Sequence, residues 1–201
     1  MSLTTFTALL VFSFVSSATP GPNNIMLFAS GVNFGLRRTW PHACGISIGF
    51  GVLLACIGFG LGYVLQSAPI LFTAIKIGGG LYMLYLAWRI ANAGPIQSGE
   101  RTARPMTFME AALFQWVNPK AWVMGLVAMA TYTAEGNYAL NVLIVVFAFC
   151  VINFPSVTLW AGFGTAMREF LRDPRKLRIF NIAMALSLII SLWPMLTVNI
   201  E

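Results

Sequence analysis

Long apolar stretches alternate with short polar connections along almost the whole chain. Because a membrane-crossing helix needs about 20 predominantly apolar residues, the longer stretches can each cross a bilayer. Six of them lie near residues 5–31, 41–65, 69–91, 108–131, 138–165 and 179–198. The pattern predicts an all-α integral membrane protein with six transmembrane helices.

The basic residues of the connections predict the orientation of these helices. The second and fourth connections contain no Lys or Arg; the first, third and fifth contain Arg37, Arg38, Arg89, Arg101, Arg104, Arg168, Arg172, Arg175, Lys176 and Arg178. Cytoplasmic loops carry an excess of basic residues. The odd-numbered connections are therefore expected in the cytoplasm, and both termini on the periplasmic or extracellular side. Since no basic residue precedes Arg37, the first stretch is interpreted as a retained helix and not as a cleaved signal peptide.

Overlaying Pro22 on Pro119 indicates an internal repeat. At this offset the second apolar stretch falls on the fifth, and each half holds three spans. Three spans per half give the halves opposite orientations, as in the inverted repeats of secondary transporters. We therefore expect one transmembrane transporter domain over residues 1–201. Its two inverted three-helix repeats and the cytoplasmic linker between them would span about 1–92, 106–201 and 93–105.

Composition narrows the class of protein. Apolar residues make up 58% of the chain and charged residues 9%, with a mean hydropathy of +0.80, whereas ordinary soluble domains are about 25% charged. The net charge of +6 lies mostly in the connections, so the lipid bilayer and not nucleic acid is the expected partner. One His, three dispersed Cys and no acidic pair within a span argue against an enzyme, and no metal or cofactor is expected.

The first span contains the unusual segment T-P-G-P-N-N well inside its apolar stretch. Pro20 and Pro22 lack backbone N–H groups, and Gly21 lets the chain bend. Unsatisfied backbone groups are costly in hydrocarbon, so such a break is expected only beside protein or a wet cavity. A half-helix beginning near Pro22 would direct N–H groups, flanked by Asn23 and Asn24, toward a substrate carboxylate. The alternative is a kink that serves helix packing alone.

The fourth span contains a matching break, Q-W-V-N-P-K, in which Pro119 frees the carbonyl of Gln115 and follows Asn118. Lys120 lies roughly 15 Å from either surface at ~1.5 Å per residue. A lysine at that depth costs about 2.5–3.5 kcal/mol on insertion scales, so it is expected to face the bundle interior or an aqueous path. We expect its partner to be the carboxylate of a bound amino acid, with backbone carbonyls as the alternative. The substrate's ammonium would then bind the carbonyls that Pro20 and Pro119 release.

Other residues have two open interpretations each. His42 and Glu110 begin the second and fourth spans, and Lys76 lies within the third; each is either an interfacial residue or a possible site of proton coupling. Asn153 and Pro155 are expected to break the fifth span and to line the same cavity. Two G-x-x-x-G spacings favour close helix packing, either within one chain or across a homodimer, and involve Gly45, Gly49, Gly58 and Gly62.

At these motifs the chain resembles the lysine-exporter type (LysE/RhtB) family of amino-acid exporters. The shared features are T-P-G-P-N-N at 19–24, the small residues at Gly45 and Gly49, K-x-G-G-G-x-Y-M-L-Y-L-A-W at 76–88 and N-P-K at 118–120. The T-P-G-P-N-N form is most similar to the members that export cysteine and O-acetylserine. The resemblance implies a bacterial inner-membrane protein whose double-proline and N-P-K motifs line the transport pathway.

The expected function is therefore that of a secondary transporter. It would export small neutral amino acids or their derivatives from the cytoplasm by alternating access, driven by the proton-motive force. A passive channel or a structural subunit of a membrane complex is the alternative. The expected pathway residues are Pro20, Gly21, Pro22, Asn23, Asn24, Gln115, Asn118, Pro119 and Lys120.

Overall fold

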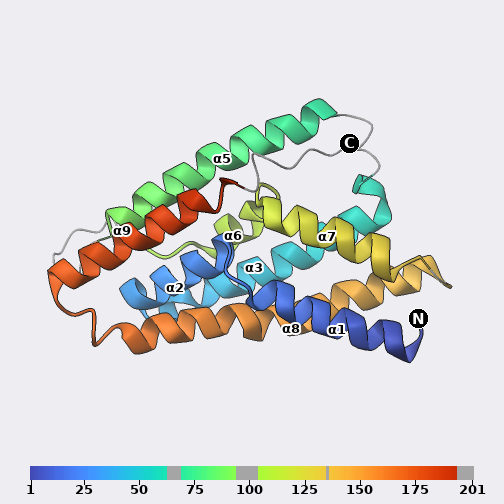
Figure 1. The fold of residues 1–201 in the computed structure, drawn as a ribbon, viewed down its shortest axis with the longest axis horizontal. Helices are drawn as coiled ribbons and strands as arrows, with labels where there is room; N and C mark the ends of the chain where they lie inside the picture. Colours follow the sequence, from blue (N-terminus) through green and yellow to red (C-terminus); the bar gives the residue numbers. More distant parts are fainter. Residues whose placement is uncertain (63–68, 94–103, 135, 194–201) are drawn as a thin grey trace.

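The computed structural model describes residues 1–62, 69–93, 104–134 and 136–193, and every regular element within them is helical (Figure 1). The all-α prediction is confirmed for these residues. The elements are α1 (Leu3–Ala18), α2 (Pro22–Phe34), α3 (Leu36–Cys56), the π-helical turn η1 (Ile57–Leu61), α5 (Pro69–Ala91), α6 (Phe108–Phe114), α7 (Pro119–Tyr132), α8 (Tyr138–Met167) and α9 (Pro174–Ile190).

Two continuous helical segments of the described chain are long and apolar enough to cross a membrane: α3 with η1, over Leu36–Leu61, and α8. The bent pair formed by α1 and α2 passes the same test as one broken span. The chain is thus a multi-pass helical membrane protein. The six-span count and the inverted repeat stay predictions, and most of the linker expected at 93–105 lies outside the described residues.

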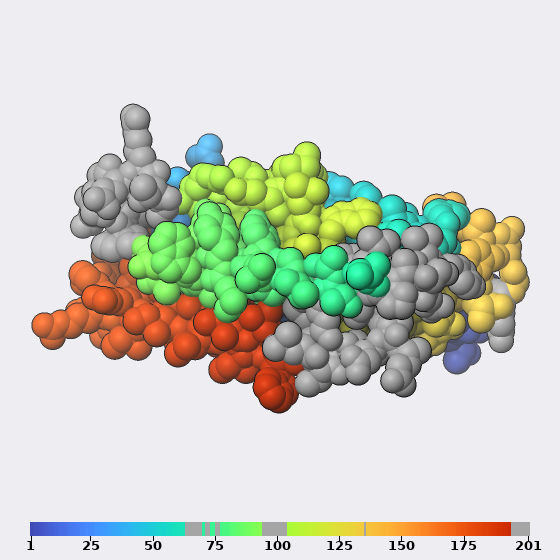
Figure 2. Space-filling model, turned by 90° about the horizontal axis from the view of Figure 1, so that it is seen from above, coloured from blue at the N-terminus to red at the C-terminus, as the bar shows by residue number. Residues whose placement is uncertain are grey.

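The long helices α3 and α8 pack against each other and carry most of the remaining elements. Helix α2 packs on both of them, α1 packs on α8, and α6 packs on α3. Helices α5 and α9 lie side by side and cover one face of the molecule (Figures 1 and 2). The outer halves of the two broken helices are thereby divided between the central pair, α1 on α8 and α6 on α3, whereas α2 and α7 each contact both central helices.

Glycines let several of these helices approach closely. A Cβ at Gly45 would contact the backbone of Phe108 on α6, and one at Gly49 would contact the backbone of Ala112. The first G-x-x-x-G spacing therefore serves packing within the chain. A second contact of this kind, not predicted, joins α2 to α8: Gly31 faces the backbone of Ala161, and Gly164 faces that of Phe28.

Helices α2, α5 and α8, which precede the three basic connections, finish at the same end of the bundle, whereas the N-terminus lies at the opposite end (Figure 1). This arrangement agrees with the expectation that the odd-numbered connections face the same side of a membrane.

Two predicted helix starts and one predicted break are wrong. Helix α3 begins at Leu36 and continues through Pro41, because a proline near a helix start removes only one exposed hydrogen bond. Helix α9 begins at Pro174, because Asp173 accepts hydrogen bonds from the first-turn N–H groups and proline suits the first helical position. Pro155 does not break the fifth span, since α8 is continuous across it.

Candidate functional site

The first break has the form that its prolines predict. Helix α1 ends at Ala18, α2 begins at Pro22, and the two are bent by 53°. Gly21 is fully extended between them and forms the N-cap of α2, where no side chain supplies a capping hydrogen bond. The partial positive charge of the α2 N-terminus is therefore not offset by a side-chain acceptor.

The carbonyl end of α1 is satisfied by distant side chains. Asn24 Nδ2 donates to the carbonyls of Ser17 at 2.9 Å and Thr19 at 2.8 Å, and Trp160 Nε1, from α8, donates to the carbonyl of Ala18 at 3.2 Å. The Oγ1 of Thr19 donates to the carbonyl of Ser16 at 3.0 Å. The carbonyls that the prolines release are thus bound within the protein. Binding of a substrate ammonium to these carbonyls stays a prediction, and the ammonium would have to share or displace the donors that they have in this conformation.

The second break is closed by its own neighbours. Asn118 is the N-cap of α7, and its side chain accepts a hydrogen bond from the backbone N–H of Lys120 at 3.2 Å. Trp122 Nε1 donates to the carbonyl of Trp116 at 2.8 Å, and the carbonyl of Gln115 accepts a long bond from the N–H of Asn118. An N-cap followed by proline is a local signal, which explains why sequence located this break correctly.

The two breaks meet in space. Lys120 Nζ donates to the carbonyl of Thr19 at 2.7 Å and to its Oγ1 at 3.2 Å. Asn23 and Gln115 form a reciprocal amide pair, with donor to acceptor distances of 2.8 Å and 3.1 Å. Lys120 thus lies at the negative end of the α1 dipole and binds a backbone carbonyl, the alternative that the sequence left open.

A cavity of about 20 Å³ lies between the breaks. Ligand pockets run from about 300 to 1,000 Å³, so this cavity is nearly closed in this conformation. Six of the nine predicted pathway residues line it; Pro20, Pro22 and Pro119 do not, and act through the backbone. Gly21 allows the close approach of Lys120, because a Cβ at this position would lie 2.8 Å from Lys120 Cδ. The lining predicted residues are Gly21, Asn23, Asn24, Gln115, Asn118 and Lys120.

Sequence reasoning missed a polar chain that crosses the bundle beside this cavity. Asn153 Nδ2, from α8, donates to Ser17 Oγ at 3.1 Å, and Ser47 Oγ, from α3, donates to Asn153 Oδ1 at 3.0 Å. Ser17 and Asn153 line the cavity, as predicted for Asn153. A serine gives only a weak signal in a span, because it also packs well between helices.

Glu110 and His42 lie outside this cavity's lining. Glu110 accepts a bidentate pair of hydrogen bonds from Arg104 and forms a capping box with Thr107. The hydrogen bond with Glu110 raises the pKa of the Arg104 guanidinium above its ordinary value, so Arg104 stays charged. His42 is buried on α3, and neither ring nitrogen has a partner among the described residues. Lys76 belongs to α5, but its side chain lies outside the described residues.

These features define a class: a multi-pass helical membrane protein with a polar cavity where two interrupted helices meet. The family model of the LysE type translocator matches residues 14–191, so the chain belongs to that family. A family of translocators also identifies the chain as a transporter and not an enzyme.

Several efflux proteins are similar over nearly the full length. The chain is 29% identical to the cysteine/O-acetylserine efflux protein of Escherichia coli O139:H28 (strain E24377A / ETEC), over 94% of this chain and 96% of that protein. It is 28% identical, with the same coverage, to the proteins of that name from Escherichia coli strain K12 and Shigella sonnei strain Ss046. No solved structure matches the chain.

Proposed function

We infer that the chain is a secondary transporter that exports small neutral amino acids from the bacterial cytoplasm. The relatives named for efflux of cysteine and O-acetylserine make these two compounds the first candidates. The protein would reside in the inner membrane, with its basic connections in the cytoplasm and both termini outside. The proton-motive force would drive export.

The packing supports an inverted repeat. When the two halves are overlaid as the sequence predicts, with Pro22 on Pro119, α1 corresponds to α6 and α3 corresponds to α8. The contact of α1 with α8 then has its counterpart in the contact of α6 with α3, while the pairs α3/α8 and α5/α9 map onto themselves. Two halves with opposite orientations supply two half-helix ends of opposite dipole at one depth.

The observation that carries the proposal is the contact between Lys120 and Thr19. It joins a cation on α7 to a carbonyl at the end of α1, at 2.7 Å. A zwitterion presents the complementary pair of charges. When it enters the cavity, its carboxylate replaces the Thr19 carbonyl as the partner of Lys120, and its ammonium takes the carbonyl that Lys120 leaves. Each charged group of the substrate loses its water and gains a charged or strongly polar partner in the protein.

The start of α2 supplies the second anchor for the carboxylate. Gly21, Asn23 and Asn24 line the cavity, and the N-terminus of α2 carries no side-chain cap. Backbone N–H groups at a helix start favour an anion. Lys120 and α2 would thus bind the carboxylate from two sides.

Proton coupling belongs to the same proposal, with Glu110, His42 and Lys76 as candidate carriers. Glu110 is held by Arg104 and Thr107, whereas His42 is buried without a hydrogen-bond partner among the described residues. Burial favours the neutral form of an imidazole, so His42 would take up a proton only in a conformation that opens its site to water or to an anion. Lys76 stays a candidate on sequence grounds.

The test is transport by purified protein in liposomes, with L-cysteine and O-acetyl-L-serine as substrates and an imposed proton gradient. Lys120→Met should lower the initial rate about 100-fold, since loss of one partner of a charge pair costs at least 2–3 kcal/mol. Lys176→Met removes an exposed lysine outside the cavity and should transport normally. Full activity of Lys120→Met contradicts the proposal. Wild-type flux that does not depend on the proton gradient, as in a passive channel, also contradicts it.

A further inference from the structure

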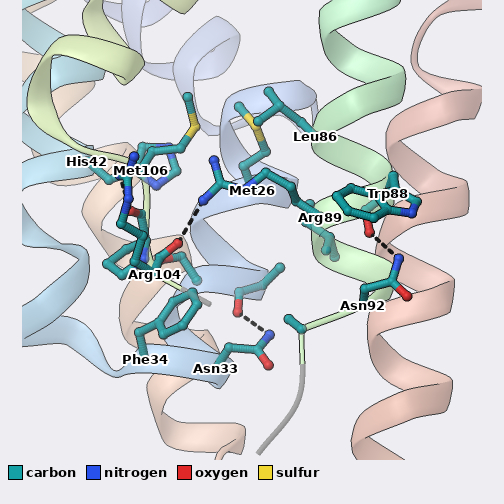
Figure 3. A pocket seen from close by; sticks show the side chains of 15 residues that line it. Met26, Asn33, Phe34, His42, Leu86, Trp88, Arg89, Asn92, Arg104 and Met106 are labelled. Carbon is teal, nitrogen blue, oxygen red and sulfur yellow. Dashed lines mark hydrogen bonds between the residues drawn. The ribbon is translucent and has the colours of Figure 1, made fainter. Parts of the chain in front are cut away.

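A larger cavity lies at the end of the bundle that carries the basic connections. It has a volume of about 180 Å³ and is bounded by α2, α3, α5 and residues 104–106 (Figure 3). None of its lining residues belongs to the central cavity between the helix breaks. It therefore offers a separate place to bind a solute.

Two polar groups on its walls have unused binding capacity. His42 is only 1% exposed, and neither ring nitrogen has a hydrogen-bond partner among the described residues. Figure 3 shows it on one wall, with Arg89 directed across the cavity. One Nη of Arg89 donates to the carbonyl of Arg104 at 3.0 Å, and its guanidinium lies 5.9 Å from the Tyr85 ring.

No carboxylate among the described residues pairs with Arg89. Glu110 is bonded to Arg104, and Glu169 pairs with Arg172. A guanidinium has five N–H donors in a fork that matches a carboxylate. The cavity thus presents an anion-binding group opposite a buried imidazole, and a neutral imidazole offers one nitrogen that accepts a hydrogen bond.

The remaining walls combine apolar side chains with three polar ones that already have hydrogen-bond partners, Ser30, Asn33 and Asn92. Met26, Leu86 and Met106 line the cavity between these polar groups. Methionine side chains adapt to ligands of different shape. The combination suits a small zwitterion with an uncharged side chain and would not satisfy a second charge on that side chain.

Helix α2 connects the two cavities. Asn23 lines the central one, and Met26, Ser30 and Asn33 line the outer one. Three residues of helix rise only about 4.5 Å, so less than one turn of α2 separates them. Met26 belongs to the same apolar cluster as Phe114, the neighbour of Gln115.

We propose that this outer cavity, with Arg89 opposite His42, is a loading site that binds the exported amino acid before it reaches Lys120. Arg89 binds the carboxylate, His42 accepts a hydrogen bond from the ammonium, and the methionine-lined wall contacts the side chain. The identity of the ligand rests on the proposed function, whereas the existence of a second site does not.

Equilibrium dialysis of radiolabelled L-cysteine, kept reduced, against purified full-length protein tests this directly. Wild-type protein should bind two molecules per chain, and Lys120→Met and Arg89→Gln should each retain one. Arg175→Gln, which removes an exposed arginine outside the cavity, should still bind two. In liposomes Arg89→Gln should raise the KM at least about tenfold with little change in kcat, because a lost charged hydrogen bond weakens binding by that factor.

The outcomes separate the two proposals. If Lys120→Met binds no cysteine, or Arg89→Gln binds two molecules, the loading site is overturned while the central site stands. If Lys120→Met still binds two molecules and only Arg89→Gln loses one, the loading site stands and the central site fails. The Lys120→Met result decides the loading site even if Arg89→Gln does not fold. Cysteamine, which lacks the carboxylate, should compete at neither site, and its competition with cysteine on Lys120→Met would overturn the role of Arg89.

Discussion

The two helix breaks use the same residue type, proline, and are stabilised in different ways. At the first, the carbonyl end of α1 depends on Asn24, on Trp160 of α8 and on Lys120 of α7. At the second, Asn118 and Trp122 supply the main hydrogen bonds from within the start of α7. The second break can therefore keep its form while helices move, whereas the form of the first depends on how the bundle is packed. A transporter can use this difference, with a fixed lysine facing a carbonyl end that exchanges partners.

Helix packing gives the largest expected difference between the two breaks. Gly31, on α2, faces the backbone of Ala161, but Gly125, on α7, faces only the side chains of Ile57 and Leu54. Gly31→Ala should lower the free energy of unfolding by about 3 kcal/mol, and Gly125→Ala by about 1 kcal/mol or less, because a side chain can yield where backbone cannot. SDS titration in mixed micelles measures both. Gly78→Ala, with open space around it, is the control, and equal losses at Gly31 and Gly125 would contradict the comparison.

The second-largest loss of stability is expected at Asn24, the asparagine that caps the carbonyl end of α1. Asn24 is buried and donates to two carbonyls. Asn24→Ala leaves both without this donor and should cost about 2 kcal/mol. Asn92→Ala, which removes an exposed asparagine bonded to a carbonyl of its own helix, should change stability little. A loss no greater for Asn24→Ala than for Asn92→Ala would show that the first break does not need its distant caps.

The second break should be less sensitive. Asn118→Ala removes one N-cap hydrogen bond and should cost about 1 kcal/mol, and Asn118→Ser should recover most of it. Thermal unfolding in detergent, followed by tryptophan fluorescence, compares the three proteins. Should Asn118→Ala prove more damaging than Asn24→Ala, the second break would not be the self-contained one.

The smallest effect is expected at the start of α6. Glu110 and Arg104 form an ion pair with partly exposed side chains, and such pairs contribute about 0–1 kcal/mol. Glu110→Gln can keep the capping box. It should therefore be nearly as stable as wild type and should still show gradient-driven transport. Loss of gradient dependence in Glu110→Gln would instead identify Glu110 as the proton carrier.

The sequence predicted the local structure of both helix breaks, but it did not predict their hydrogen-bond partners on distant helices. Proline and N-cap signals located both breaks, because they act within one turn. The donor from Trp160 lies 142 positions from the carbonyl of Ala18 that it binds, and no pattern along the chain links them. The contact of Gly31 with α8 could not be predicted for the same reason.

Boundary errors have a similar cause. The basic residues before the last span suggested a longer connection, but Asp173 begins α9 among them. Pro155 stays inside a helix because the long α8 tolerates one missing hydrogen bond when its neighbours pack against it. Among the described residues, the prolines that break a span are accompanied by glycine or by an asparagine cap.

The exchange of partners at Lys120 is most directly measured by solid-state NMR of the protein in lipid, with 15N in the lysine side chains and 13C in the carboxylate of bound L-cysteine. The account predicts a dipolar coupling between the Lys120 nitrogen and the substrate carboxylate that is absent from Lys120→Met. A bound substrate whose carboxylate shows no coupling to any lysine nitrogen, or the same coupling in Lys120→Met, would contradict it.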